Sequence, residues 1–182
     1  LADEVMKLAP IPAHYAADVF DCDAVEAVKE FSVWGGIPRY WELRKDYADF
    51  ETAIKNLLLD TQGILAEEPQ RLLRDDMRDT VQTATLLSII GNGAHRLSEI
   101  ASRVGKGANE ITEPLKKLRD LGYVRREIPF DENERNSKRG LYFVDDNLFK
   151  FFFRFVAPNA SVLELGAMEA VMNVVEAEMP SF

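Results

Sequence analysis

The sequence predicts a mainly α-helical protein with one small β-hairpin, arranged as a helical bundle followed by a winged helix-turn-helix. Three observations lead to this fold class. Hydrophobic residues make up 47% of the 182 residues, which is enough to build packed cores. They recur mostly at the three- and four-residue spacing of helices. The spacing changes to alternation only at 123–128 and 141–144, where two short strands are expected.

The first part of the chain, residues 1–80, is expected to form a bundle of short helices. Asp23 precedes Glu26 by three residues, a capping-box pattern that marks a helix start. Gly35-Gly36 ends that helix, and Pro38 begins another, because proline is tolerated in a first helical turn. Further helices are expected near residues 49–60 and 67–78.

A winged helix-turn-helix is expected over residues 81–158. Two helices fit within 81–104, separated by Gly91-Asn92-Gly93. A third helix, with Pro114 near its first turn and Gly122 just past its end, is indicated by an apolar stripe: Ile111, Leu115, Leu118 and Leu121. The two strands follow, joined by a polar loop. Three helices and then a hairpin is the order of elements in a winged helix-turn-helix.

Two more helices are expected at 147–156 and 161–178. The phenylalanine-rich part of the first should pack in a core, because Lys150 and Arg154 occupy a single polar stripe. The second is broadly apolar and belongs to a trailing segment, 159–182, that we expect to lead into a missing C-terminal domain. Such a surface predicts docking on the rest of a longer protein or on a second copy of the chain.

Charge is distributed unevenly along the chain. The net charge is −9, which argues against indiscriminate nucleic-acid binding, since phosphate contacts need Lys and Arg. Between Arg96 and Asp145, however, 11 Lys and Arg residues stand against 9 Asp and Glu, a net charge of +2. The remaining residues therefore carry −11. The middle of the chain is electrostatically distinct from both flanks.

The cellular setting is inferred from what the sequence does not contain. Cys22 is the single cysteine, so no internal disulfide is possible, and no signal segment opens the chain. No apolar run approaches the roughly 18 residues of a membrane-spanning helix. We expect a cytoplasmic protein that does not enter a membrane. The ends at Leu1 and Phe182 suggest a fragment of something longer.

A series of short motifs, taken in order, resembles one known family. The motifs are Trp34 to Tyr40, Leu72 to Asp76, Leu86 to Gly93, Ser98 to Ala101, Leu118 to Val124, Leu141 to Asp146, Phe149 to Phe155 and Ala157 to Asn159. Together they resemble the C-terminal half of archaeal and bacterial AAA-like (STAND-type) P-loop ATPases. Those proteins carry a helical lid, a winged helix and then an endonuclease-like domain of unknown function.

The resemblance implies a parent protein that binds ATP and magnesium, but the given residues contain no catalytic site. A phosphate-binding loop needs G-x-x-x-x-G-K-[ST], and the nearest pair, Gly105-Lys106, has Ile100 in place of the first glycine and Gly107 in place of the hydroxyl. No Asp-x-Lys or Glu-x-Lys occurs for a metal-dependent nuclease. The chain alone is therefore expected to be non-catalytic, with its own ATPase core and C-terminal domain as partners.

A nucleotide-facing turn is the first candidate site. The resemblance implies that Gly35, Gly36 and Pro38 lie in a lid turn near the nucleotide, with Arg39 pairing with the γ-phosphate. The alternative is purely structural, because a Gly-Gly end and a proline start punctuate helices without any ligand.

The third helix and the wing form the second candidate site, for nucleic acid. Early residues of a recognition helix meet base edges, and the wing meets phosphates. The candidate residues are Lys106, Asn109, Thr112, Lys116, Arg135, Lys138 and Arg139. Glu110 and Glu113 in the same turn would repel phosphate. The wing is equally consistent with a solvated mixed-charge loop, and winged helices also dock proteins.

Metal and acid–base chemistry find no support. His14 and His95 are widely separated and lack spaced Cys or His partners, so no metal site is expected. Asp145-Asp146 fits helix capping. Three functions therefore remain open at this point. They are a nucleotide-state transmission and docking module of an ATPase, a DNA-binding transcription regulator, and a structural interaction domain.

Overall fold

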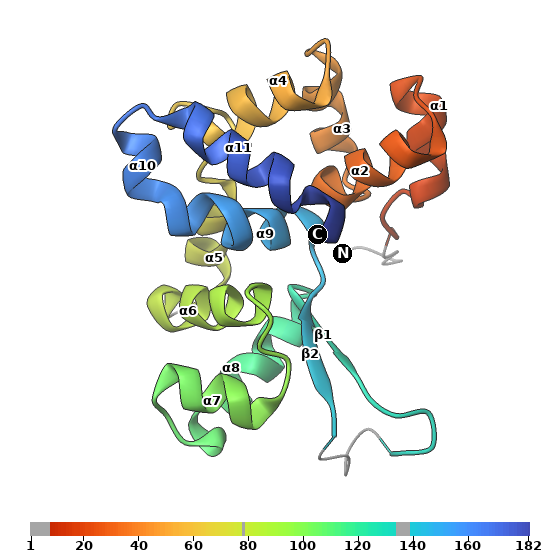
Figure 1. The fold of residues 1–182 in the computed structure, drawn as a ribbon. Helices are drawn as coiled ribbons and strands as arrows, with labels where there is room; N and C mark the ends of the chain where they lie inside the picture. The colour runs from red at the N-terminus through yellow and green to blue at the C-terminus, as the bar shows by residue number, and fades with distance from the viewer. Residues whose placement is uncertain (1–7, 78, 134–138) are drawn as a thin grey trace, which may run out of the picture.

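The computed structural model describes residues 8–77, 79–133 and 139–182. They form two lobes joined at a waist (Figure 1). The upper lobe, called the helical lobe below, contains η1 (Ala13–Tyr15), α1 (Ala16–Phe20), α2 (Ala24–Trp34), α3 (Pro38–Lys45), α4 (Phe50–Ile54), η2 (Lys55–Leu59), α9 (Asn147–Phe151), η3 (Phe152–Val156), η4 (Ala157–Asn159), α10 (Ala160–Glu164), α11 (Met168–Glu178) and η5 (Met179–Ser181). The lower lobe, the winged-helix lobe, contains α6 (Thr80–Gly91), α7 (Leu97–Val104), α8 (Ala108–Asp120), β1 (Val124–Glu127) and β2 (Leu141–Val144). The predicted fold class, mainly α with a small hairpin, is confirmed.

The winged-helix lobe is inserted into the helical lobe. The chain leaves the helical lobe through α5 (Glu68–Asp76), passes through α6 to β2, and returns at α9. There α9 lies against α2, and α11 lies against η2. The segment 159–182, expected to lead into a missing domain, thus lies on the first half of this same chain. Its apolar face, formed by Val171, Met172 and Val175, is buried there.

The helix starts in the helical lobe follow the capping signals in the sequence. The Asp23 carboxylate accepts hydrogen bonds from the backbone N–H groups of Val25 and Glu26, at 2.8 and 2.9 Å. Pro38 opens α3 as predicted. Asp49 was not predicted to cap a helix. Its carboxylate caps α4 by accepting a hydrogen bond from the Thr52 N–H at 2.7 Å. These bonds satisfy N–H groups that have no partner within the helix.

Two π-helical turns depart from the predicted helices. The helix expected at 49–60 changes at Lys55 into η2, and the one at 147–156 changes at Phe152 into η3. Both turns occur where successive residues are apolar and buried: Leu57, Leu58 and Leu59 in η2, and Phe152, Phe153, Phe155 and Val156 in η3. A π-turn, with its i→i+5 bonds, holds more residues per turn than an α-helix, so adjacent apolar side chains can share the core side.

A buried ion pair, not anticipated from the sequence, lies in the core of the helical lobe. Glu30 and Arg44 are 3% and 7% exposed. The Arg44 guanidinium donates to both Glu30 carboxylate oxygens, with Nη2 to Oε1 at 2.6 Å and Nε to Oε2 at 2.9 Å. The Trp34 indole N–H donates to the same carboxylate at 2.7 Å, and Arg44 also donates to the Tyr47 carbonyl at 2.9 Å. The two charges are therefore paired and hydrogen-bonded, as burial requires.

The winged-helix lobe has the predicted strands. β1 and β2 are antiparallel, with Val124 opposite Val144 and Glu127 opposite Leu141. An isolated antiparallel β-bridge joins Arg96 to Leu141, so the segment before α7 pairs with the start of β2. Gly122 lies just past α8 with a φ of 83°, as expected for a residue that ends a helix. The core is apolar: Leu86, Leu87, Ile90, Ile100, Ile111, Leu115, Leu118, Val124, Tyr142 and Val144.

Two details of the expected helices are wrong. The third helix begins at Ala108, so Pro114 lies in its middle and not near its first turn. The Glu110 carboxylate explains the early start, since it accepts the Gly107 N–H at 2.8 Å. The single helix expected at 161–178 is broken into α10 and α11 around Gly166, whose φ of 77° favours glycine.

Side chains from both lobes meet at the waist. The Tyr123 hydroxyl donates to the Asp76 carboxylate at 2.5 Å, and its ring stacks on Phe149 with centroids 4.7 Å apart. Lys117 donates to the Asp76 carbonyl at 2.6 Å. On another side the Asn92 amide donates to the Phe153 carbonyl at 3.1 Å. The waist is thus fixed at separate points.

Candidate functional site

The Gly35-Gly36 turn is filled by the protein's own backbone. Gly35 has a φ of 57°, and its carbonyl accepts the Trp41 indole N–H at 2.6 Å. The Gly36 carbonyl accepts the Ile11 N–H at 2.8 Å. A Cβ atom at Gly36 would overlap the Ile11 carbonyl oxygen. Close backbone packing therefore accounts for Gly36, and the positive φ accounts for Gly35.

The remaining two residues of the predicted nucleotide turn point elsewhere. Pro38 is exposed at the first turn of α3. Arg39 is also exposed, and its guanidinium lies 3.5 Å from the Glu42 carboxylate. The structure therefore buries Gly35 beside Asn147 and Gly36 beneath Ile11, and it leaves the other two residues at the surface. The four residues do not converge on one cavity.

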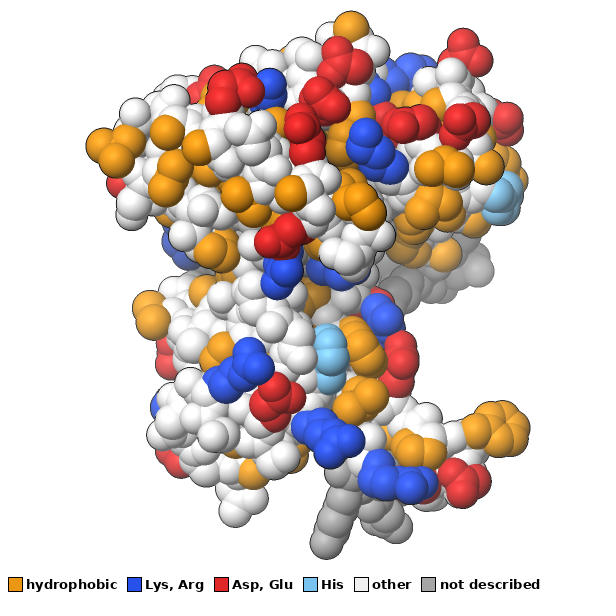
Figure 2. All heavy atoms as spheres, viewed as in Figure 1, with side chains coloured by type: hydrophobic (Ala, Val, Ile, Leu, Met, Phe, Trp, Pro, Cys, Tyr) orange, Lys and Arg blue, Asp and Glu red, His pale blue; other side chains and the backbone are white. Residues whose placement is uncertain are grey.

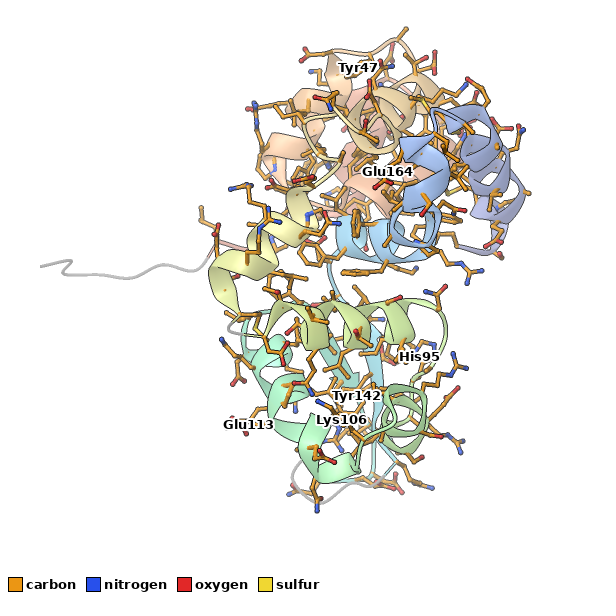
Figure 3. The ribbon with its side chains drawn as sticks, turned by 90° about the vertical axis from the view of Figure 1, so that its left-hand side faces the viewer. Tyr47, His95, Lys106, Glu113, Tyr142 and Glu164 are labelled. Carbon is orange, nitrogen blue, oxygen red and sulfur yellow. The ribbon has the colours of Figure 1, made fainter. Side chains whose placement is uncertain are left out.

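The predicted face of α8 lies at the surface of the winged-helix lobe. Lys106, Asn109, Thr112 and Lys116 are all exposed. Residues 109, 112 and 116 are three and four apart, so they share one side of the helix. The Thr112 hydroxyl donates to the Ala108 carbonyl at 2.8 Å. Figure 3 shows Lys106 at the outer end of this lobe.

The two carboxylates near the start of α8 are used in different ways. Glu110 is engaged in capping the Gly107 N–H at 2.8 Å. Glu113 is exposed and lines a small hollow with Pro114, Lys117 and Asp120. Figure 3 shows Glu113 on the same outer part of the lobe as Lys106. Both carboxylates keep their negative charge beside the predicted contact residues, although Glu110 is held at the helix start by its hydrogen bond to the Gly107 N–H.

The wing is described only in part. Arg139 pairs with Glu132 and lies 4.0 Å from the Asp131 carboxylate. This matches the mixed-charge alternative for that side of the loop. Arg135 and Lys138, the other predicted wing contacts, lie outside the described residues. The wing therefore contributes one placed arginine to the candidate site.

The basic side chains of the winged-helix lobe divide into paired and open ones. Arg103 pairs with Glu99 at 2.8 Å, and Arg125 pairs with Glu127 and Asp145. Arg96, Lys106 and Lys116 are exposed, and the ion pairs described for the structure do not include them. Lys117 is also exposed, but it donates to the Asp76 carbonyl. Figure 2 shows acidic side chains gathered on the helical lobe and basic ones beside the hairpin.

A hollow of about 610 Å³ opens beside the start of α8. It was not predicted from the sequence. It lies between the starts of α7 and α8 and the hairpin, and three arginines line it: Arg96, Arg126 and Arg139. Arg126 is not among the contact residues predicted from the sequence. Arg96 had no assigned role, because its neighbours in space are on β2, more than 40 residues away. A local sequence signal for that contact does not exist.

Other chemistries are not supported within the described ranges 8–77, 79–133 and 139–182. No group of three or more His, Cys, Asp or Glu side chains gathers there to hold a metal ion. The helices of those ranges are also too short or too polar to cross a bilayer. His95 instead forms a hydrogen bond between its Nδ1 and the Tyr142 carbonyl, at 2.9 Å.

Comparisons with known proteins give one relative and no family. No protein-family model matches the sequence, and no solved structure is significantly similar to it. An uncharacterized protein of Methanocaldococcus jannaschii is 29% identical over 170 residues. The match covers 91% of this chain and 37% of the relative. The chain therefore corresponds to little more than a third of that longer protein.

Proposed function

We propose that the chain is a non-catalytic transmission and docking module of a P-loop ATPase, in which the helical lobe faces the ATPase core. One observation carries this proposal. α9 contacts α2 in the helical lobe and also contacts α6 and β2 in the winged-helix lobe. A displacement of the helical lobe would therefore move the winged helix with it, because packed elements transmit motion as units.

The longer relative provides the test of the ATPase part. This chain and the full-length M. jannaschii protein are each incubated with magnesium and ATP, and phosphate release is measured. Turnover is expected from the relative, through residues beyond the matched region, and none from this chain, which has no phosphate-binding loop. Hydrolysis by this chain, or a relative that neither binds nor hydrolyses ATP, removes the proposal.

A second candidate function is contact with duplex DNA through the winged helix. It is favoured by the exposed face of α8, where Asn109 and Thr112 offer hydrogen-bonding groups between Lys106 and Lys116. Such side chains read base edges and neutralise phosphates, respectively.

Salt dependence separates DNA contact from protein docking. Fluorescence anisotropy with a short labelled duplex of random sequence is measured at low and at higher salt. Binding that weakens steeply as salt rises is expected, since phosphate contacts release counterions. A Lys116→Gln variant should weaken binding and lower the salt slope by about one. If the wild-type chain does not bind at low salt, this second candidate is rejected and the docking proposal stands.

A further inference from the structure

We propose that the hollow between α7, α8 and the hairpin is a binding site for a backbone phosphodiester of nucleic acid. The inference rests on the second candidate function and adds a site that lies off the exposed face of α8. Arg96 comes from the residue before α7, Arg126 from β1, and Arg139 from the residue before Gly140 and β2. Three separate elements thus bring guanidinium groups to one cavity.

The lining favours an anion. Three arginines contribute to it, and no Asp or Glu is among the described residues that form it. The remaining lining residues are neutral: Leu97, Ser98, Ala108, Gly140, Leu141 and Tyr142. Arg139 is already paired with Glu132, so it offers less positive charge to an anion than its formal charge implies. Guanidinium groups present planar forks of N–H donors that match phosphate oxygens, which makes arginine well suited to this ligand.

Arg126 is positioned by its neighbours. Its guanidinium lies so close to Gly140 that a Cβ atom there would overlap it. On the same strand pair it stands over the Tyr142 ring, with the guanidinium carbon 5.8 Å from the ring centroid. A side chain larger than hydrogen at 140 would displace it. The glycine before β2 therefore serves the placement of an arginine in the hollow, in addition to any role in the loop.

The position of the hollow favours nucleic acid over a small anion. Ala108, the first residue of α8, lines it, so it adjoins the end of the helix that carries Lys106 and Asn109. A nucleic-acid strand that meets the early turns of α8 would pass between that helix and the hairpin. Phosphate contacts of this kind fix the register of a recognition helix. A cavity of about 610 Å³ has room for a phosphate together with its sugar.

The test compares arginines that line the hollow with one that lies outside it. Arg96→Gln and Arg126→Gln are compared with the matched control Arg103→Gln, which removes the same charge from α7 but lies outside the cavity. With the labelled random duplex, each of the first two should bind roughly tenfold more weakly, with a salt slope lower by about one. The control should stay close to the wild type.

A second measurement does not depend on the variants folding. Backbone amide chemical shifts of the wild-type chain are recorded while the unlabelled duplex is added, and changes are expected at Leu97, Ser98 and Gly140. The phosphate site is rejected if the wild type binds the duplex without these shift changes, or if the Arg96 and Arg126 variants bind as well as the wild type. DNA contact through α8 would still be supported in either case. Absence of any wild-type binding at low salt overturns both. Equal binding of polyglutamate overturns the preference for phosphate.

Discussion

The two lobes keep their charged side chains in different places. In the helical lobe, Glu30 and Arg44 are buried together, whereas the described residues of the winged-helix lobe bury no charged side chain. The helical lobe thus keeps a charged pair in its interior, whereas the described charged side chains of the winged-helix lobe lie at its surface, where the proposed contact with DNA would need them. Substitutions of charged residues should therefore affect stability in the first lobe and binding in the second.

The largest effect should come from breaking the buried pair. Glu30→Ala leaves the Arg44 guanidinium in the core without its carboxylate, which is expected to cost about 3–5 kcal/mol of unfolding free energy. Both tryptophans of the chain, Trp34 and Trp41, lie in the helical lobe, so the shift of their emission in urea follows that lobe.

The matched control for this prediction lies in the other lobe. Glu99→Ala removes the partner of the exposed Arg103 and should cost less than about 1 kcal/mol. If the two variants lose similar stability, the contrast between the lobes is wrong.

A smaller loss is expected at the glycine turn. Gly36→Ala places a Cβ atom against the Ile11 carbonyl oxygen, and overpacking of this kind costs about 1–3 kcal/mol. Gly107→Ala is the control, since Gly107 has a φ of −66° and its nearest neighbour is the flexible Glu110 carboxylate at 3.2 Å. Thermal unfolding without nucleotide measures both variants. If the Gly36→Ala variant is as stable as the wild type, the packing role is wrong. The alternative that this turn faces a nucleotide would then be favoured.

The waist offers a prediction about coupling between the lobes. Tyr123→Phe keeps the ring stacked on Phe149 but removes the hydrogen bond to Asp76, at an expected cost of about 1 kcal/mol. Tryptophan emission follows the helical lobe, and circular dichroism follows both lobes. We expect the two transitions to coincide in the wild type and to separate slightly in the variant. Coincident transitions with unchanged midpoints would show that this contact does not couple the lobes.

The smallest effect concerns pH. Burial raises the pKa of Asp146, which caps α9 by accepting the Phe149 N–H at 2.9 Å. Because the folded-state pKa of Asp146 lies above the ordinary aspartate pKa of 3.8, the contribution of Asp146 to stability is present below pH 3.8. It is lost as the pH rises through the folded-state pKa.

The test of this pH effect is a variant that keeps the cap and removes the charge. Asp146→Asn should flatten part of the dependence of unfolding free energy on pH above 3.8. At neutral pH the variant should be more stable than the wild type, because asparagine caps a helix about as well as aspartate and carries no buried charge. A steeper pH dependence in the variant would contradict the sign.

The sequence predicts the fold class well because its local signals are strong. The capping carboxylate of Asp23, the proline start at Pro38 and the strand pairing at 123–128 and 141–144 depend on near neighbours or on simple periodicity. The phenylalanine cluster packs in the core as expected, and Asp146 caps a helix. Each of these follows from residues a few positions apart.

The features that the sequence did not predict depend mainly on contacts between residues far apart in the sequence. Arg44 meets Glu30 from another helix, and Arg96 meets the hairpin only after the chain has turned back through β2. The middle position of Pro114 was missed because the Glu110 cap starts the helix one turn early. Periodicity also gave no sign of the π-turns, which arise where adjacent apolar residues all need burial.

The return of the chain at α9 has a mechanical consequence. Residues on either side of the inserted lobe are held to each other by the contacts of α2 with α9 and of η2 with α11. Tension applied between the two flanks would stretch those contacts first. The inserted lobe would carry no load until those contacts rupture, so the winged helix would keep its shape while the two flanks are under tension.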